Sequence, residues 1–333
     1  MMRSPMLTAA VVASVMLIGT VAQGATTFGA NYDSTKAAGI AAGNPVPVVA
    51  GDTFSVIDPN TSKFGAGSLN TTGVFQGGNG LKYDTASNFN PLAGTIDFWM
   101  QMPNGYNGVR QDLFSIFAGG FTGDFSLYLN PDFSRLTLVV DVAGANQWVQ
   151  HSQGGLANAI LGDGNWHHIA WEWDTSPGDP NSAFSTLYVD GVGESFNPLF
   201  GTVSFAGGTL GTDMEIGSRQ GGFDAFQGNI DDMRIFDTAI YNQVVSFTPP
   251  TTSTIPDFIL SGDFDGSGTV DGFDFLEWQR DPGVGNLSDW EANYGASVGS
   301  TAAISAVPEP SSVVLLALLA ATVTTTVRKR SPL

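Results

Sequence analysis

Residues 164–174 read GNWHHIAWEWD, and residues 185–196 read STLYVDGVGESF. In the first stretch, every second residue from Ile169 to Trp173 is large and apolar, so these side chains share one face of an extended strand. In the second stretch, Asp190-Gly191 supplies the positive φ angles that a two-residue hairpin turn needs. The two stretches therefore predict a strand followed by a β-hairpin.

The same alternation continues on both sides of these stretches. GTIDFWMQM (94–102) places Ile96, Phe98 and Met100 on one face, and RLTLVVDV (135–142) alternates in the same way. Glycine is abundant, at 42 residues, and charged residues make up only 13 % of the chain, against about 25 % in ordinary soluble domains. Short alternating strands and glycine-rich turns, with no long amphipathic helix from about 26 to 248, predict an antiparallel β-sandwich.

The order of these landmarks resembles that of laminin-G-like jelly-roll domains. In that family a Trp and a His open a strand and a Tyr-x-Asp-Gly hairpin follows, as in residues 164–192. KFGAGSLN (63–70) and GTIDFWMQ (94–101) match the family's entry strands, and residues 214–240 match its closing strand. The resemblance implies a mainly β fold, an antiparallel jelly-roll sandwich of the concanavalin A-like lectin/glucanase superfamily. Lectins, adhesion modules and hydrolases share this fold, so it leaves the function open.

The charge and the cysteine content exclude several classes of function. The formal net charge is −19, and no cluster of basic residues gives the positive footprint of a nucleic-acid-binding protein. The chain has no cysteine, which excludes disulfides, thiolate catalysis and cysteine-bound zinc. An acidic surface suits solubility and the binding of divalent cations.

A carboxylate pair on one strand is the best candidate for catalysis. Glucanases of the superfamily carry Glu-x-Asp-x-x-Glu, and residues i and i+2 of a strand point to the same face, as two catalytic carboxylates require. Glu172-Trp173-Asp174 matches the first half of this pattern, but the third carboxylate is missing and Pro177 interrupts the strand. We therefore predict that the protein is not an enzyme. An unusual or degenerate glycoside hydrolase is the alternative.

Two further polar pairs allow both a functional and a structural interpretation. His167-His168 could bind a metal or act as a base, but a histidine at the start of a strand is more often a packing residue. Asp231-Asp232 could form a calcium site at the rim of the sandwich, as in some laminin-G-like relatives, or cap a tight turn before the closing strand. In both cases the structural interpretation is favoured.

Exposed aromatic side chains are common in sugar-binding sites, since a pyranose face packs on a ring. Four aromatic residues in or beside loops are candidates for ligand binding: Tyr106, Trp148, Phe223 and Phe226. A jelly roll also needs aromatic residues in its core, so about two of the four are expected to be buried. The others are expected to contact a glycan or a protein.

Residues 263–274 read DFDGSGTVDGFD and follow the spacing of an EF-hand-type calcium loop. Such a loop places oxygen ligands at positions 1, 3, 5, 7, 9 and 12, and a glycine at position 6 makes the sharp turn. Gly268 occupies position 6, and the hydrophobic position 8 is Val270. The oxygen positions are filled by Asp263, Asp265, Ser267, Thr269 (through its backbone carbonyl), Asp271 and Asp274. The loop therefore predicts calcium as a cofactor.

Aspartate at the last position, followed by FLEW, makes this loop resemble a dockerin repeat, a module that binds cohesin domains. A dockerin has two loop–helix units, whereas here only a second helix follows, in LSDWEANY (287–294). Ser288 is the expected N-cap of this helix and Gly295 its end. Without a second loop, Val270 lacks its usual partner, so cohesin binding does not carry over from the resemblance.

We therefore predict a small helical mini-domain over residues 257–296. A segment of about 40 residues or fewer usually needs a metal or a disulfide to fold. The expected core of this mini-domain consists of Trp278, Trp290 and Tyr294.

The N-terminal segment, residues 1–24, has the three parts of a secretory signal peptide. Arg3 gives a positive start, an apolar run follows, and Ala22-Gln23-Gly24 places small residues at the cleavage site. A buried helix is the alternative, but polar, turn-forming sequence follows directly. We expect the protein to be exported.

The C-terminal segment, residues 307–333, combines a Pro-Glu-Pro motif, an apolar run and a basic end. The run Val313–Val327 has 15 residues, which gives about 22 Å as a helix and is short for a hydrocarbon core of about 30 Å. The segment resembles the PEP-CTERM sorting signal, with Pro308, Glu309, Pro310, Arg328, Lys329 and Arg330 as the matching residues. The resemblance implies processing by an exosortase-type enzyme, transient anchoring of a C-terminal transmembrane helix in the inner membrane, and delivery to the cell surface or extracellular matrix. A permanent anchor is the alternative.

The remaining segments read as linkers. SFTPPTTSTIPD (246–257) is rich in Pro and Thr, so we expect a semi-rigid spacer over 249–256 and a flexible one over 297–306. The sandwich is expected over 26–248. The sequence as a whole predicts a secreted, non-catalytic surface or matrix protein whose sandwich binds an extracellular polysaccharide or a surface protein. A structural matrix component without a specific ligand is the alternative.

Overall fold

The computed structural model describes most of the chain: residues 24–48, 55–72, 80–118, 124–141, 148–152, 154–175, 184–194, 197–200, 209–256, 260–265 and 269–296. The expected signal peptide (apart from Gly24), the C-terminal linker and the sorting tail lie outside these residues. Within the described ranges, no helix is both long and apolar enough to cross a membrane.

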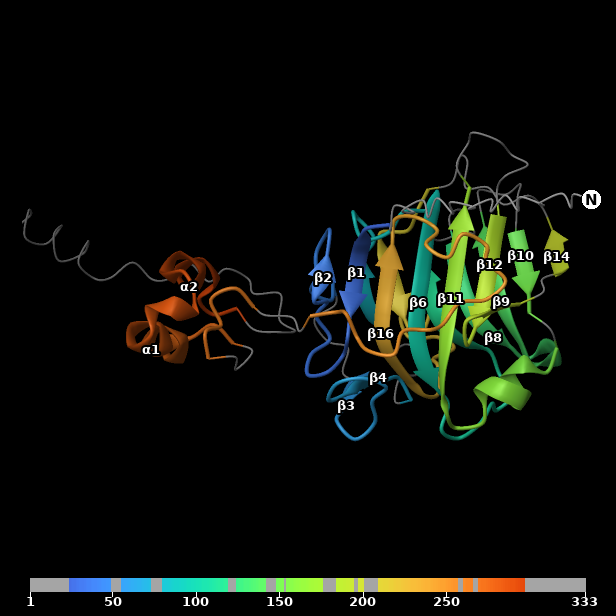
Figure 1. Ribbon diagram of the computed structural model, residues 1–333, viewed down its shortest axis with the longest axis horizontal. Helices are drawn as coiled ribbons and strands as arrows, with labels where there is room; N and C mark the ends of the chain where they lie inside the picture. Colours follow the sequence, from blue (N-terminus) through green and yellow to red (C-terminus); the bar gives the residue numbers. More distant parts are fainter. Residues whose placement is uncertain are drawn as a thin grey trace, which may run out of the picture.

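Two antiparallel sheets face each other across one hydrophobic core (Figure 1). The first consists of β1 (Thr26–Ala30), β2 (Ile40–Ala41), β3 (Val56–Asp58), β4 (Ser68–Asn70), β6 (Ala93–Gln101), β11 (Trp166–Asp174), β12 (Phe184–Val189), β13 (Val192–Gly193) and β16 (Asn229–Phe236). Seven of these nine strands lie in the order β13-β12-β11-β6-β16-β1-β2, while β4 also pairs with β16, and β3 with β4.

The second sheet has seven strands: β5 (Leu81–Asp84), β7 (Gln111–Ile116), β8 (Asp124–Asn130), β9 (Arg135–Asp141), β10 (Trp148–His151), β14 (Asn197–Phe200) and β15 (Asp213–Ile216). Their order is β14-β10-β9-β8-β7-β15-β5. A 3₁₀ turn (Asp132–Ser134) lies between β8 and β9 of this sheet, and a π-helical turn (Ala157–Leu161) lies between β10 of this sheet and β11 of the first. The two packed sheets confirm the mainly β jelly-roll sandwich that the sequence predicts.

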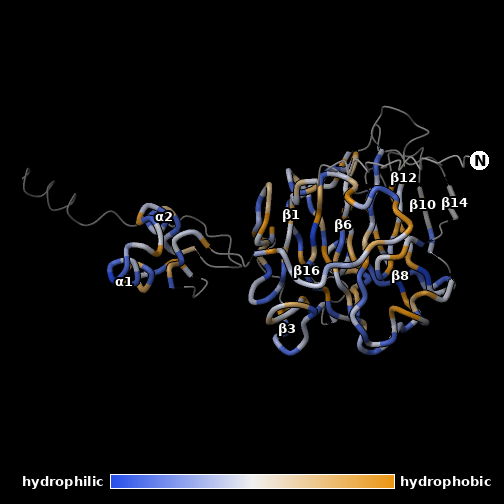
Figure 2. Tube along the Cα trace, viewed as in Figure 1, coloured by the Kyte–Doolittle hydropathy of each residue, from blue (hydrophilic) through white to orange (hydrophobic). Residues whose placement is uncertain are grey.

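The alternation of the central strands places the core between the sheets. Ile96, Phe98 and Met100 of β6 are fully buried in it, and so are the large apolar residues of β11 from Ile169 to Trp173. Hydrophobic and hydrophilic residues accordingly intermingle along the strands rather than separating into blocks (Figure 2). The predicted hairpin is also present: Asp190 and Gly191 have φ angles of 51° and 75° between β12 and β13.

Residues 237–256, here called the strap, cover part of the outer face of the nine-stranded sheet (Figure 1). The rings of Tyr241 and Phe247 stack 3.7 Å apart, and the Phe247 N–H donates to the carbonyl oxygen of Gly191. Ile255 is 6 % exposed and lies against Gly29 of β1. The segment 249–256, expected to be a linker, is therefore packed on the sandwich, because its apolar and hydroxyl side chains find partners on the sheet.

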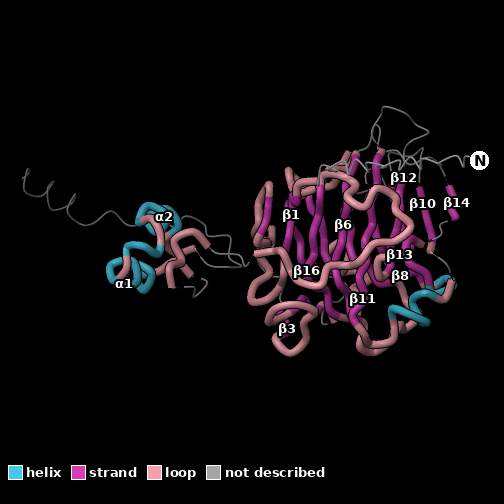
Figure 3. Tube along the Cα trace, viewed as in Figure 1, coloured by secondary structure: helices cyan, strands magenta, loops and turns pink. Residues whose placement is uncertain are grey.

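The C-terminal part of the described chain is helical (Figure 3) and contains α1 (Gly272–Arg280), a 3₁₀ turn (Pro282–Val284) and α2 (Leu287–Asn293). Phe275, rather than Tyr294, is central to its apolar cluster, since the Phe275 ring lies 4.9 Å from that of Trp290 and 6.1 Å from that of Trp278. Tyr294 contacts Trp290 but is 52 % exposed.

Two details of this mini-domain differ from the prediction. The residue before α2 is Asn286, so Ser288 lies inside the helix rather than at its N-cap. Val270 does have a backbone partner, because its N–H donates to Ala296 and its carbonyl accepts from Gly295, each at 2.8 Å. The chain that follows α2 thus occupies the place of the absent second loop.

Candidate functional site

A row of polar residues crosses the seven-stranded sheet on the face opposite the core. Asp112 of β7 pairs with Tyr128 of β8, Tyr128 with Thr137 of β9, and Thr137 with His151 of β10. Paired residues of antiparallel strands share a face, and four adjacent strands span about 14 Å. The row is linked further, since Thr137 Oγ1 lies 2.8 Å from His151 Nδ1. The outer face of this sheet therefore carries a continuous line of hydrogen-bonding groups, of which Asp112, Tyr128 and Thr137 are buried.

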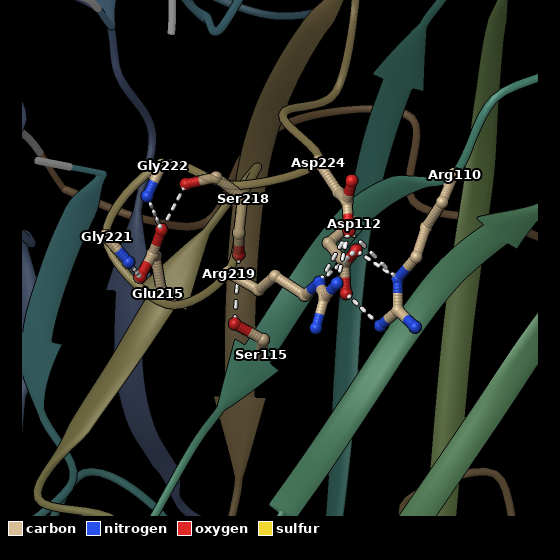
Figure 4. A network of polar contacts seen from close by, with 9 residues as sticks. All are labelled: Arg110, Asp112, Ser115, Glu215, Ser218, Arg219, Gly221, Gly222 and Asp224. Carbon is tan, nitrogen blue, oxygen red and sulfur yellow. Dashed lines mark hydrogen bonds and ion pairs between the residues drawn. The ribbon is translucent and has the colours of Figure 1, made fainter. Parts of the chain in front are cut away.

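Arg110 is fixed at one end of the row. Its Nε and Nη2 groups donate to the two carboxylate oxygens of Asp112 at 2.7 and 2.8 Å (Figure 4). Its guanidinium also lies over the Tyr128 ring, 3.6 Å from the centroid. Asp112 is fully buried, and this burial raises its pKa while the neighbouring arginines oppose the rise. Arg110 is thus held rigidly from two sides.

A second arginine comes from the loop that follows β15. Arg219 donates to Asp224 through Nε and Nη2, each at 2.6 Å, and its Nε lies 3.7 Å from Asp112 (Figure 4). The side chains of Arg110 and Arg219 remain 29 % and 28 % exposed. Each guanidinium carries five N–H donors, so both retain donors for an additional acceptor. We call Arg110, Asp112, Arg219 and Asp224 the arginine cluster.

Glu215 of β15 holds the loop that carries Arg219. Its carboxylate accepts hydrogen bonds from the Ser218 hydroxyl at 2.5 Å and from the N–H groups of Gly221 and Gly222 at 2.8 Å (Figure 4). Both glycines have positive φ angles, of 83° and 99°, which other residues adopt only with strain. The local sequence therefore fixes the position of Arg219 through the backbone.

Phe223 is the one predicted aromatic candidate that the structure places beside the arginine cluster. It is half-buried, and its backbone exchanges two hydrogen bonds with Arg219, at 2.9 and 2.7 Å. Phe226, three residues later, is fully buried in the core, so its prediction as a ligand-binding residue is wrong. The reason is that the chain re-enters the sandwich at Phe226 to begin β16.

The other two aromatic candidates lie elsewhere. Tyr106 packs against the core, and burial raises the pKa of its hydroxyl to about 12. Trp148 is the first residue of β10, where it pairs with Val140; its side chain lies outside the described part of the structure. Neither residue is brought to the arginine cluster by the described contacts.

Sequence analysis did not identify the arginine cluster. Its residues come from two segments that are about a hundred positions apart, Arg110–Asp112 and Arg219–Asp224. The only local signal is that the chain has few basic residues and that each arginine stands close to an aspartate in sequence. That signal is common on protein surfaces, so the pairing of the segments requires the fold.

The polar pairs on β11 and β16 have structural partners. His167 lies between Asp190 (2.8 Å) and Asp163 (3.0 Å), which together raise its pKa. His168 is fully buried between the rings of Trp99 and Phe247, and burial lowers its pKa to about 4. These contacts agree with the favoured packing role for the two histidines.

Asp231 and Asp232 lie inside β16, at an irregularity of its pairing with β6, rather than at a turn before the strand. Asp231 accepts hydrogen bonds from the N–H groups of Lys63 and Phe64, at 2.6 and 3.1 Å. Asp232 accepts one from the Ser253 hydroxyl of the strap. Both aspartates therefore hold other segments against the strand, and the predicted turn-capping role is wrong in its location.

Glu172, the candidate catalytic carboxylate, is fully buried under the strap. It accepts hydrogen bonds from the N–H groups of Tyr241, Asn242 and Gln243, at 3.0, 3.1 and 2.7 Å. The Tyr188 hydroxyl donates to it as well, at 2.9 Å. Four donors thus occupy this carboxylate.

The acidic loop brings together three of the predicted calcium ligands. Carboxylate oxygens of Asp263, Asp265 and Asp274 all lie within 4.8 Å of one another. Asp274 is buried and accepts hydrogen bonds from the N–H groups of Phe264, Asp265 and Asp271. Calcium binds hard oxygen ligands at about 2.3–2.6 Å, and oxygens this close to one another suit a shared ion.

The other predicted ligands have different positions. Asp271 is the N-cap of α1, and its side chain accepts from the Phe273 N–H at 2.7 Å. Thr269, at position 7 of the loop, is a single β-bridge residue that directly precedes Val270. Ser267 lies outside the described residues. Of the six predicted ligands, the described structure thus brings three carboxylates together.

Comparison with known proteins gives one family match. The model of the family described as the concanavalin A-like lectin/glucanases superfamily matches residues 75–246. No curated protein sequence is significantly similar to the chain.

Solved structures of sialidases are among those similar to this chain. The CBM40 of the Ruminococcus gnavus IT-sialidase, bound to alpha2,6 sialyllactose, is 17% identical with a TM-score of 0.36; the match covers 49% of this chain and 88% of that chain. The NanB sialidase from Streptococcus pneumoniae is 18% identical (57% of this chain, 29% of that chain, TM-score 0.38). A leech intramolecular trans-sialidase is 17% identical (56% and 28%, TM-score 0.37).

Proposed function

This chain belongs to the concanavalin A-like lectin/glucanase superfamily, and from that membership we propose that it is a glycan-binding protein whose binding face is the outer face of the seven-stranded sheet. The observation that supports the proposal most is the arginine cluster. Two guanidinium groups are immobilised by carboxylates, and both remain more than a quarter exposed. Groups fixed in advance lose little conformational entropy when a ligand binds.

The charge of the arginine cluster favours a neutral ligand. Its two arginines and two aspartates compensate each other, so the cluster carries no formal net charge. Guanidinium donors and carboxylate acceptors together match the hydroxyl groups of a neutral sugar, each of which both donates and accepts. Phe223, at the same loop, offers a ring against which the apolar face of a pyranose packs.

The contacts of Glu172 support binding rather than hydrolysis. A retaining hydrolase needs two carboxyl groups about 5–5.5 Å apart that are open to substrate. Glu172 is buried and engaged by four donors, and the arginine cluster places its aspartates against arginines. We therefore propose a protein that binds sugar without cleaving it.

A glycan array probed with the full chain tests this proposal. We expect binding to neutral oligosaccharides that weakens at least about tenfold in Arg219→Gln and in Phe223→Ala. Asp224, the partner of Arg219, is 31 % exposed and stays hydrated when Arg219 is replaced, so the sandwich keeps its fold. Arg280→Gln and Phe273→Ala, both at exposed positions of α1, are the matched controls.

Three other results of this experiment would contradict the proposal. Binding that is unchanged in both variants would move the binding face elsewhere. Silence across the array would favour the structural matrix component. Released sugar would favour a hydrolase.

We also propose that the mini-domain binds calcium through Asp263, Asp265 and Asp274. Their clustered oxygens support this, because adjacent carboxylates repel each other unless a cation lies between them. A bound ion would tie the start of the loop to α1. Secreted modules bind calcium at about 10⁻⁴–10⁻³ M, so occupancy would follow the calcium concentration of the medium.

Export and surface delivery complete the proposed function. Two segments support them: residues 1–24, with a basic start, an apolar run and small residues at the cleavage site, and residues 307–333, with a Pro-Glu-Pro motif, an apolar run and a basic end. In this proposal the mature protein stands at the cell surface or in the extracellular matrix after processing by an exosortase-type enzyme, with the lectin-like sandwich as its binding part.

A further inference from the structure

A groove of about 670 Å³ lies on the other face of the sandwich, away from the arginine cluster. It opens beside the outer face of the nine-stranded sheet, where β6 and β11 meet the loop before β4 and the strap. Three aromatic rings line it, those of Phe64, Trp99 and Trp166, and residues 248–251 of the strap form one wall. Aromatic and proline side chains together with a few polar groups are the usual lining of a small-ligand site.

Trp99 contributes a buried donor that has no acceptor. The residue is 7 % exposed, and its indole N–H has no hydrogen-bond partner among the described residues. A buried donor without a partner is energetically unfavourable. Trp99 lines the groove, but its indole nitrogen is covered, so an acceptor on a ligand there would satisfy this N–H once a small movement of the neighbouring side chains uncovers it.

Lys63 contributes a cation beside the same ring. Its Nζ lies 3.7 Å from the centroid of the Trp99 ring, and within the described part of the chain it forms no ion pair. Asp190, the acidic residue in the lining of the groove, is already engaged by the His167 imidazole and the His168 N–H. Asp231 accepts from the backbone N–H groups of Lys63 and Phe64. In a chain with a formal net charge of −19, an ammonium group without a carboxylate partner is unusual.

We propose that this groove is a second binding site, which takes an acidic sugar residue whose carboxylate accepts from Lys63 and from the indole N–H of Trp99. The two donors lie together because the ammonium group rests on the ring that carries the N–H. Trp166 is half-buried and gives the remaining aromatic surface on which the sugar ring packs. A charge-assisted hydrogen bond is roughly twice as strong as a neutral one, so the ammonium group distinguishes an acidic sugar from a neutral one.

Calorimetric titration of the full chain with tetragalacturonate tests the proposal, with its fully methyl-esterified form as the uncharged probe of nearly equal shape. Both titrations are made in chelator, which removes any contribution of the acidic loop. They are made at physiological ionic strength, where the Debye length of about 8 Å screens the net charge of the protein. We expect the acid to bind at least about tenfold more tightly than the ester.

Variants locate the site. Lys63→Gln should remove the preference for the acid, Lys63→Arg should keep it, and Trp166→Ala should weaken both probes. Arg280→Gln removes a positive charge outside the sandwich and should change nothing. Phe223→Ala alters the proposed neutral-glycan site beside the arginine cluster and should leave the preference for the acid unchanged, so that failure of the proposed function and failure of this inference are distinguishable.

Three results would overturn the inference. The first is equal binding of the acid and its ester. The second is absence of binding of both probes to the wild-type chain, when that chain shows a normal thermal unfolding transition. The third is a preference for the acid that survives Lys63→Gln.

Discussion

Buried carboxylates of this sandwich accept hydrogen bonds from segments that are distant in sequence. Glu172 accepts from residues 241–243, and Asp231 accepts from Lys63 and Phe64. A buried charge is tolerated when donors compensate its lost hydration. These residues act as fixed points for irregular segments, which explains why acidic side chains occur on inner strands of the nine-stranded sheet.

The environment of His168 predicts a pH dependence of stability. Its pKa is lowered to about 4 from the ordinary 6.5 because the ring is buried. Below pH 6.5 the unfolded chain takes up a proton that the folded chain does not, so the free energy of unfolding falls between about pH 6.5 and 4. The loss amounts to about 3 kcal/mol when complete.

Thermal unfolding of the wild type and of His168→Phe at pH 7 and pH 5 measures this effect. The variant should lose less stability on acidification, since at position 168 it has no imidazole that could take up a proton in the unfolded state. His167 acts in the opposite direction, because its raised pKa stabilises the fold at low pH, but it is present in both proteins. Equal losses in the two proteins would contradict the account of His168.

The aromatic candidates show what a residue-level prediction can reach. Phe223 and Phe226 occur in the same short glycine-rich segment, GGFDAFQG. One is half-buried beside Arg219 and the other is fully buried in the core. Composition predicts that some of these rings are buried, but only the path of the chain back into β16 decides which.

At the scale of elements, the alternation of apolar residues along the strands predicts the core. It does not predict that the strap covers the outer face of the nine-stranded sheet. The inward residues of β6 and β11 and the turn at Asp190-Gly191 are as expected. The strap includes residues 249–256, which are predicted to be a linker because their Pro and Thr residues favour an extended chain. Its contacts with Glu172, Asp232 and Gly191 join distant residues, and local sequence does not encode them.

Replacing Glu172 with Gln should loosen the strap. The neutral amide has one acceptor oxygen, so backbone N–H groups of residues 241–243 would lose their charged partner. We expect a loss of about 2 kcal/mol or more in the free energy of unfolding, at about 1–3 kcal/mol per unsatisfied buried group. Urea unfolding measures it, with the exposed Glu291→Gln of α2 as the control. Surface substitutions usually change the free energy of unfolding by less than about 0.5 kcal/mol. A change this small in Glu172→Gln would contradict its role in holding the strap.

At the scale of the whole molecule, calcium should act on the mini-domain alone. At about 10 mM calcium, the ion should stabilise this part by about 1.4–2.7 kcal/mol, while the transition of the sandwich stays where it is in chelator. Asp263→Ala or Asp274→Ala should abolish the calcium effect, and Glu291→Gln should keep it. Calorimetry of the full chain measures both transitions. A mini-domain transition that does not respond to calcium would contradict the proposed site.

The C-terminal tail should determine where the protein goes. Deletion of residues 308–333 removes the Pro-Glu-Pro motif, the apolar run and the basic end, so the truncated protein should be secreted in soluble form instead of reaching the surface or matrix. Immunoblots of the medium, the matrix fraction and the washed cells measure this. Retention of the truncated protein at the surface would show that another part of the chain determines its delivery.

Strands and short helices are easier to predict from the sequence than binding sites are. Periodicity and turn residues are local, so the sandwich and the two helices of the mini-domain follow from the sequence. The arginine cluster and the groove each combine residues from distant segments, such as Arg110 with Arg219 and Lys63 with Trp99. Their chemistry therefore appears only when the sheets are assembled.

The central claim is that a neutral glycan binds at the arginine cluster, and amide hydrogen exchange of the full chain tests it most directly. The exchange is compared with and without a saturating concentration of the oligosaccharide that binds most tightly on the array. We predict slower exchange in residues 110–116 and 217–227, with no change in α1 and α2. Slower exchange confined to other segments, or no change anywhere, would contradict the claim.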